Sequence, residues 1–547
     1  MIRIILFILC FGFAIPTMAQ DKPDYQSFGS WPVLHDGRIK TMESFARSVF
    51  YKISGETTLN DTSAIEWLTN TTFDPASTIS KPFIKINKQT ILDLPDRGSK
   101  YYSMNDVMVA LQPHQELIAN LELADPSKLS SSQLELLNVY VAASIYNQII
   151  QSFSAVLPLQ GQDDLSYLDG GGVSAQRDLI AEGGRENILL KFIPTDNPSM
   201  PMISLWQAVN SDLQTPIISD LENMAVAWNE GDYVTWNDQS NEIGNAVQIE
   251  NTSSTKLDLE HIYVTAQPMI WVMALYLMSA VILFVKPQWI MGQYIALAGF
   301  IIHAIALGAR SYILSRPPTG TLYETLLFGA FIIMMVGLGV IYKRRYQTLF
   351  LGVCAVASTC LLFISRGFIE GDSLNVLVAV LNTNFWLSTH VTCIIFGYSF
   401  CVLASLTAHI YLLKPQDNFR KLMMILAICA LLFTSVGTLL GGIWADQSWG
   451  RFWGWDPKEN GALLIVLWLI WVLHGRLSGH FKLRGFATAL ALTNIMVALT
   501  WFGVNLLGVG LHSYGFISGI AYGLGGFIIA QITVVVGLYF YNWKNVP

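Results

Sequence analysis

Cysteine is scarce in this chain of 547 residues, and its absence from one long segment excludes several kinds of chemistry. The sequence has six cysteines, none of them between residues 21 and 265. That segment therefore has neither a disulfide scaffold nor a thioredoxin-like CxxC site. The motif CxxCH, which carries covalently attached c-type haem, is missing from the whole sequence. The cysteines beyond residue 265 lie in hydrophobic stretches, where thiols usually behave as small apolar side chains: Cys354, Cys360, Cys393, Cys401 and Cys429.

Charged residues are also few, and their distribution indicates a membrane protein with a large polar part. Only 13% of the residues are charged, whereas 52% are hydrophobic. Residues 1–20 have the pattern of a secretory signal peptide, with Arg3 before an apolar stretch and small residues around Ala19; an uncleaved first helix is the alternative. Residues 21–265 are polar, are long enough for their own core, and show helical periodicity at 130–153 behind a serine cap.

Residues 266–547 are predicted to form a polytopic α-helical membrane domain, which makes the fold class mainly α, with a mostly helical extracytoplasmic domain before it. Nine apolar spans are long enough to cross a bilayer: approximately 268–286, 290–313, 322–342, 347–365, 386–413, 421–443, 460–477, 485–509 and 515–541. Secretion of the polar segment would leave eleven lysines and arginines on the inner side and five on the outer side. This asymmetry follows the positive-inside rule, and it places the loop between the sixth and seventh spans outside.

That loop, at 444–460, is the most informative segment, because tryptophans gather in it far more densely than in an ordinary interfacial belt. It contains Trp444, Trp449, Trp453 and Trp455. An indole has an apolar body and one polar N–H group, so isolated tryptophans are common at membrane surfaces. Four of them within a dozen residues predict a flat aromatic surface suited to a large planar molecule such as a porphyrin.

Two histidines are predicted to flank the tryptophan loop on the outer face. His390 lies at the start of the fifth span, and His512 follows the eighth. Because neutral imidazoles are suitable axial ligands, the pair predicts a porphyrin iron held between them. His303 and His474 lie within spans, where ionisable residues are usually functional. Their expected depths differ by about 10 Å of helix rise, so we do not expect these two to bind one iron together.

Charged residues near the loop complete the predicted site. Asp456 opens the seventh span with the pattern of a helix cap, and its carboxylate is also suited to orient a tryptophan, a histidine or the guest. Tyr323 and Glu324, at the start of the third span, are expected to face the same cavity. The outward cations available to pair with propionate carboxylates are Arg316, Arg366 and Arg451. Arg451 ranks first because it lies inside the loop.

The string WGRFWGWDPKE, at 449–459, resembles the WWD signature of haem-handling proteins in cytochrome c maturation. The similarity is greatest to CcsA (ResC), one half of the System II cytochrome c synthase, and it extends over roughly residues 268–541. It includes the two outer histidines and the membrane histidine His474. It also includes an H…R…P…YE pattern formed by His303, Arg310, Pro318, Tyr323 and Glu324.

The resemblance implies a cytochrome c synthase, or haem lyase, component in the bacterial inner membrane, with the polar domain and the WWD loop in the periplasm. It implies that haem b is held by His390 and His512 and is attached through thioether bonds to the CxxCH segments of apocytochromes c. The tryptophans of the loop, Asp456, Arg451 and His303 would be further haem contacts. His474 would belong to a transmembrane haem site whose other ligand lies on a CcsB (ResB)-like subunit. Thiol-reducing periplasmic proteins would take part indirectly, and nucleic acid is not an expected partner.

Three other functions are compatible with parts of the pattern. A permease for haem or another organic anion would use nine helices and intramembrane histidines, but it would need a site near the membrane midplane. A WWD protein of the other bacterial maturation route would deliver haem to a chaperone, and a neighbouring CcsB-like gene would argue against it. A structural anchor for the polar domain would not need so many outer aromatic residues and histidines.

Overall fold

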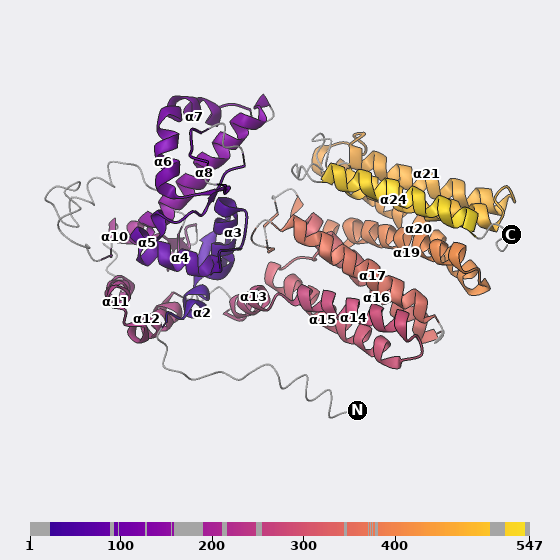
Figure 1. Ribbon diagram of the computed structural model, residues 1–547, viewed down its shortest axis with the longest axis horizontal. Helices are drawn as coiled ribbons and strands as arrows, with labels where there is room; N and C mark the ends of the chain where they lie inside the picture. Colours follow the sequence, from indigo (N-terminus) through magenta and orange to yellow (C-terminus); the bar gives the residue numbers. More distant parts are fainter. Residues whose placement is uncertain are drawn as a thin grey trace. The chain divides into compact units, whose positions relative to one another are not determined.

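The computed structural model describes residues 22–87, 92–96, 98–125, 128–154, 156–157, 190–197, 199–210, 216–247, 254–343, 347–369, 371, 373–374, 376–377, 381–503 and 520–541. The chain divides into two compact units. The first unit consists of the described residues up to Val264 together with Gly371, and the second consists of the remainder from Thr265. The two units are described separately below, and their helices are labelled in Figure 1.

The first unit is mostly helical, with short two-stranded antiparallel sheets. Its helices are α2 (Tyr25–Gly29), α3 (Met42–Ser54), α4 (Ala64–Phe73), α5 (Pro75–Ile79), α6 (Met104–Leu111), η2 (Gln112–His114), α7 (Gln115–Glu122), α8 (Ser131–Ser152), α10 (Leu205–Asn210), α11 (Pro216–Glu230), α12 (Tyr233–Ala246) and α13 (Ser254–Ala266). Its paired strands are β1 (Pro32–His35) with β2 (Arg38–Thr41), β3 (Thr58–Leu59) with β4 (Thr62–Ser63), β5 (Ile84–Lys85) with β6 (Tyr101–Tyr102), and β7 (Ile193–Pro194) with β8 (Met202–Ile203).

Local sequence signals account for several of these elements. The helix predicted behind a serine cap is α8, and it is confirmed: the side chains of Ser130 and Gln133 each accept the other residue's backbone N–H. Strands β1 and β2 meet at a two-residue turn, Asp36-Gly37, in which both residues have positive φ (52° and 74°). An Asp-Gly pair tolerates that backbone conformation, and it matches the twist of a tight hairpin.

A buried ion pair ties α13, the last helix of the first unit, to β2. The guanidinium of Arg38 donates to both carboxylate oxygens of Glu260, and Ser44 Oγ donates to the same carboxylate at 2.7 Å. The Glu260 side chain is 1% exposed, so this pairing compensates for removing its charge from water. The position of α13 against the unit therefore depends on a specific polar contact as well as on apolar packing.

The second unit contains nine helices in its described residues that are long and apolar enough to span a membrane, as predicted (Figure 1). They are α14 (Pro268–Val285), α15 (Ile290–Leu314), α16 (Leu322–Lys343), α17 (Thr348–Ser365), the continuous run of α18 (Asn384–Trp386), η6 (Leu387–Val391) and α19 (Thr392–Leu413), then α20 (Asp417–Trp449), α21 (Pro457–Leu477), the pair α22 (Leu483–Ala491) and α23 (Thr493–Trp501), and α24 (Ile520–Tyr541). A short turn, η4 (Arg366–Phe368), follows α17.

Helix α20 is longer than its sequence predicts. The sixth span was predicted to end at residue 443, but the helix continues to Trp449 and ends where Gly450 adopts φ 69°. The polar stretch Asp446-Gln447-Ser448 does not interrupt a helix by itself, whereas a glycine in the left-handed conformation is a common helix terminator. Two of the four tryptophans therefore lie on the last turns of a helix, and the loop itself is confined to residues 450–456.

Helices α19 and α20 approach each other closely because glycines lie at their interface. A Cβ atom added to Gly397 would lie 2.5 Å from Thr434 Oγ1 and 2.8 Å from the backbone nitrogen of Thr434. A Cβ atom added to Gly437 would lie 2.8 Å from the side chain of Ile394. Small residues of this kind allow membrane helices to pack backbone against backbone.

The eighth span is broken between α22 and α23, and neighbouring side chains bond the backbone carbonyl that the break leaves without its helical partner. The N–H of Ile495 donates to Leu492 and not to Ala491, so the Ala491 carbonyl loses its helical partner. Ser405 Oγ and Gln531 Nε2 donate to that carbonyl at 2.6 and 2.8 Å. An irregular backbone inside an apolar bundle requires such substitutes, because no water is available to bond the exposed carbonyl.

The α19–α20 contact gives the first testable prediction. Substituting Gly397→Ala should lower the stability of the protein in detergent by about 1–3 kcal/mol, because the new methyl group meets backbone atoms that cannot move easily. The midpoint of thermal unfolding measures this effect. Gly339→Ala, in α16, is the matched control, since a Cβ atom there meets nothing within 4 Å. Equal midpoints for the two variants would contradict the close packing of α19 and α20.

Candidate functional site

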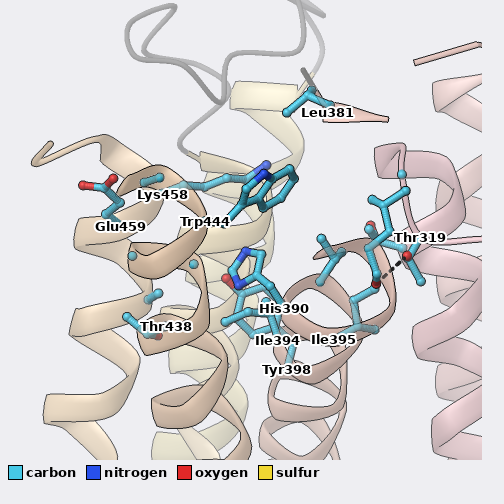
Figure 2. Close-up of a pocket in the computed structure, with 18 of the residues that line it drawn as sticks. Thr319, Leu381, His390, Ile394, Ile395, Tyr398, Thr438, Trp444, Lys458 and Glu459 are labelled. Carbon is cyan, nitrogen blue, oxygen red and sulfur yellow. Dashed lines mark hydrogen bonds between the residues drawn. The ribbon is translucent and has the colours of Figure 1, made fainter. Parts of the chain in front are cut away.

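A cavity opens at the end of the helical bundle where α16 and α21 begin and α20 ends. Its walls come from the loop before α16, the first turns of the fifth span, the end of α20 and the start of α21. The space inside it that is not occupied by atoms amounts to about 1140 Å³, part of which is open to solvent. Figure 2 shows His390 and Trp444 near its centre, with Lys458 and Glu459 on one side and Thr319 on the other.

His390 lines this cavity, and a neighbouring carbonyl determines which of its ring nitrogens carries a proton. The Nδ1 atom lies 2.8 Å from the carbonyl oxygen of Gly437. A carbonyl only accepts hydrogen bonds, so Nδ1 carries a proton, and in the neutral imidazole the lone pair is then on Nε2. Such a bond to the distal ring nitrogen is the arrangement that orients a histidine as a metal ligand.

The backbone around His390 is a π-helical turn, η6, placed between α18 and α19. Single π-helical turns inside α-helices are rare and occur frequently at functional sites. The imidazole also packs against backbone, since a Cβ atom added to Gly441 would lie 2.5 Å from His390 Cε1. The glycine at 441 is therefore needed for the ring to occupy this position.

The predicted aromatic surface exists, but its members differ from those expected. Trp444, Trp449 and Trp453 line the cavity. Trp444 is stacked on Trp386 with ring centroids 6.2 Å apart and an interplanar angle of 11°, and its ring is also in edge contact with His390. Trp386 is held in turn by a hydrogen bond from Nε1 to Gln447 Oε1. The stacked pair and the imidazole thus form one wall.

Trp455 does not line the cavity. Its side chain is 70% exposed, and its backbone has φ 57°, which is unfavourable for a residue with a Cβ atom. The conformation is held by its neighbours: Asn460 Nδ2 donates to the Trp455 carbonyl at 3.0 Å, and Glu459 Oε2 accepts from the backbone N–H groups of Gly454 and Asp456. The loop is therefore fixed by side chains from the first turn of α21.

Asp456 is buried and acts as the helix cap that the sequence suggested. Its carboxylate accepts the backbone N–H of Lys458 at 2.8 Å, and it forms a capping box with Glu459. Both Lys458 and Glu459 line the cavity, whereas Arg451, the cation ranked first from the sequence, is exposed and does not. The cation that lines the cavity is thus one that sequence reasoning left out of the site.

Glu324 and Arg316 are not available to the cavity, contrary to expectation. The Glu324 side chain is fully buried and accepts hydrogen bonds from Arg310 at 2.8 Å and from Arg316 at 2.6 Å. Tyr323 is buried beside the Arg310 guanidinium, whose carbon lies 5.0 Å from the ring centroid. Burying a carboxylate is costly unless cations pair with it, and the two arginines fill that role for Glu324. The residues that face the cavity are instead Thr319 to Leu322.

The remaining predicted residues lie elsewhere. His303 is completely buried among the helices, with Nδ1 3.2 Å from the Tyr276 hydroxyl, and it does not line the cavity. His474 is exposed on α21, and its Nδ1 donates to the Ile470 carbonyl of its own helix. Arg366 is exposed in η4, and His512 lies outside the described residues. Among the described residues, no cluster of three or more His, Cys, Asp or Glu side chains is arranged to hold a bare metal ion.

Sequence reasoning missed several residues that line or support the cavity, among them Trp386, Tyr398, Lys458 and Trp501. One of them had a usable signal, because Trp386 precedes His390 by four residues and thus lies on the same helical face. Lys458 follows the cap residue Asp456 by two positions, and nothing in the sequence shows that its side chain faces the cavity. Tyr398 and Trp501 form the apolar floor, and their roles depend on helix rotations that no local pattern specifies.

Comparison with known proteins shows what the membrane domain is similar to. Residues 319–512 match the family described as cytochrome C assembly protein. The membrane part of this chain is therefore similar to the cytochrome c assembly family over these residues. Relatives named CcsA agree with that assignment, and together they confirm the CcsA-type resemblance found in the sequence.

The matched relatives overlap this assembly domain to different extents. Protein NrfI of Wolinella succinogenes is 31% identical over 230 residues, which are 39% of this chain and 25% of NrfI. The CcsA protein of Chlamydomonas reinhardtii is 33% identical over 218 residues, 36% of this chain and 61% of that protein. The CcsA protein of Guillardia theta is 28% identical over 274 residues, 43% of this chain and 88% of that protein. This chain therefore spans less than two thirds of the first two relatives.

The strained backbone of Trp455 gives the second prediction. Trp455→Gly should raise the free energy of unfolding in detergent by about 1 kcal/mol, because glycine adopts positive φ without the Cβ penalty. Thermal unfolding measures the change. Trp453→Gly is the comparison: Trp453 lines the cavity and has no positive φ, so its loss should be destabilising. A drop in stability for Trp455→Gly would show that contacts of the indole outweigh the backbone strain.

Proposed function

We propose that this chain holds haem b in the cavity beside the tryptophans and presents it for attachment to the CxxCH segments of apocytochromes c. The observation that carries the proposal is the geometry of His390. Its Nδ1–H bond to the Gly437 carbonyl fixes the neutral tautomer whose Nε2 is suited to bind iron. Haem is the substrate in this account, with His390 as one axial ligand and His512 as the other.

The lining of the cavity supports a flat, amphipathic guest. The indoles of Trp444, Trp449 and Trp453 supply apolar surface for the porphyrin ring. Lys458, at the start of α21, supplies a cation for a propionate carboxylate. Haem combines an apolar ring with two anionic groups at one edge, and these side chains match both properties.

The chemistry that the site would assist is addition of a thiol across a vinyl group. Each cysteine sulfur bonds to the vinyl carbon next to the ring, its proton goes to the terminal carbon, and the double bond becomes single. No electrons are lost, so the reaction needs no oxidant. A site that fixes the haem turns a bimolecular encounter into an effectively unimolecular step, and the histidine of the incoming CxxCH is suited to replace one axial imidazole.

The partners follow from the same proposal. A CcsB (ResB)-like membrane subunit would complete the complex and supply the second ligand for a transmembrane haem at His474. Thiol-reducing periplasmic proteins would keep the CxxCH cysteines reduced. The chain would lie in the bacterial inner membrane as a multi-pass protein, with its first unit and the tryptophan loop in the periplasm. In this arrangement haem lyase activity belongs to the complex of the two subunits.

The direct test is the absorption spectrum of the reduced protein, purified with and without a co-expressed CcsB-like partner. Wild type should show a low-spin, bis-imidazole haem, and His390→Ala and His512→Ala should lose most of it. Added imidazole should restore the spectrum in either variant, because it replaces the missing ligand. Unchanged haem retention and cytochrome c yield in both variants would contradict the proposal, and a wild type without haem would favour the permease.

A second test separates the two loop cations. Lys458→Gln should weaken haem retention by ~10-fold, the size expected for one lost charge-assisted hydrogen bond. Arg451→Gln should change it little, because Arg451 does not line the cavity. Titration of the detergent-purified protein with haem measures both affinities. The reverse order of effects would mean that the propionates point toward the loop and not toward α21.

A further inference from the structure

We infer that Thr319 and Glu324 are positioning residues for His390: they hold the π-helical turn that directs its imidazole into the cavity. The inference rests on the proposed function, because that function makes His390 the ligand to be positioned. Neither residue is expected to touch haem iron. Their effect passes through the loop between α15 and α16 and through the first turn of the fifth span.

Glu324 fixes the backbone of that loop. Its Oε2 accepts the backbone N–H groups of Gly320 at 2.8 Å and Thr321 at 3.2 Å. The same carboxylate is bound by Arg310 from α15 and by Arg316 from the loop itself. Because Glu324 and Arg310 are 0% exposed, these bonds are shielded from water and are correspondingly strong. The loop is thereby attached to the starting turn of α16 at several points.

Thr319 connects this fixed loop to the fifth span through a hydrogen bond. Its Oγ1 donates to the carbonyl oxygen of Leu387 at 3.3 Å, the contact drawn as a dashed line in Figure 2. Leu387 is the first residue of the π-helical turn. Its carbonyl also accepts the backbone N–H of Thr392, five residues on, and the Thr392 hydroxyl at 3.0 Å. Two hydroxyl groups thus stabilise the carbonyl where the turn departs from the α-helical pattern.

The π-helical turn determines which way His390 faces. A π-helical turn contains one residue more than an α-helical turn, so residues within and before it are rotated by up to about 100° relative to a continuous α-helix. The imidazole then has little freedom of its own, because it lies against Gly441 and is bonded to the Gly437 carbonyl. A change in the turn would therefore move the ring out of its pocket and would not be absorbed by a different rotamer.

The simpler interpretation is that the buried ion pairs of Glu324 only stabilise the fold. That interpretation predicts a different result. If the ion pairs only stabilise the fold, their loss would reduce folding and haem retention together, whatever residue replaced the glutamate. Positioning predicts that a mild change in the connecting hydroxyl weakens the iron ligand while the protein remains folded. Thr319 is therefore the more informative residue to change.

The experiment compares Thr319→Val with Thr319→Ser in the full-length protein, purified with the CcsB-like partner if that is needed for haem. Valine keeps the shape and removes the hydroxyl, and serine restores the hydroxyl. We expect Thr319→Val to retain ~10-fold less haem than wild type, the loss typical of removing an outer-shell partner. Imidazole should restore its low-spin spectrum, and Thr319→Ser should resemble wild type. Thr359→Val removes a hydroxyl that donates to the Ala355 carbonyl within α17; it is the matched control and should not differ from wild type.

The alternatives give distinguishable results. Wild-type retention in Thr319→Val would overturn the inference, and so would a loss that neither imidazole nor Thr319→Ser reverses. Glu324→Gln should shift haem binding in the same direction as Thr319→Val if it folds, and imidazole should again restore it. His390→Ala is measured in parallel: if it retains haem, the proposed function fails, whereas loss in His390→Ala with no effect of Thr319→Val removes only the positioning role.

Discussion

The close approach of α19 and α20 determines where the central histidine lies. Glycines at 397 and 437 allow the two backbones to pack against each other, and Gly441 leaves room for the His390 ring. The ring then bonds to a carbonyl of the facing helix, that of Gly437. Membrane helices gain little from hydrophobic burial against each other, so packing and interhelical hydrogen bonds of this kind decide their arrangement. The same contact thus joins the two helices and orients the imidazole.

Buried polar groups impose the second constraint, and two of those described above are bonded by several neighbouring groups. Glu324 is paired with two arginines, and the Ala491 carbonyl at the helix break is bonded by Ser405 and Gln531. In a medium without water, a polar group of this type that lacks a hydrogen-bond partner destabilises the folded protein by several kcal/mol. Such networks have few alternative arrangements, which makes them suited to fixing a loop or a helix break rather than to adding stability.

The sequence predicted the nine helices because length and hydropathy suffice to identify membrane spans. It placed the end of the sixth span too early, since Asp446, Gln447 and Ser448 resemble a loop, and only the conformation of Gly450 ends the helix. The interior of the site was less predictable. Which face of α16 meets the cavity depends on helix rotation, and this is why Glu324 was assigned to the cavity and Lys458 was not. The stacking of Trp386 on Trp444 is a tertiary contact between spans, and hydropathy contains no information about it.

The position of the cavity bears on the choice between a permease and a site of attachment. Its walls are the first turns of α16 and α21, the last three turns of α20 and the part of the fifth span from Leu387 to Tyr398, so it lies toward one end of the bundle. A permease needs a site near the midplane that is reached from both sides in turn. A site at the end of the helices, with its imidazole held by two backbones, is instead suited to keep a guest in one orientation while a second macromolecule reaches it from outside. Rigidity, which would impede transport, is what a templated bond-forming step requires.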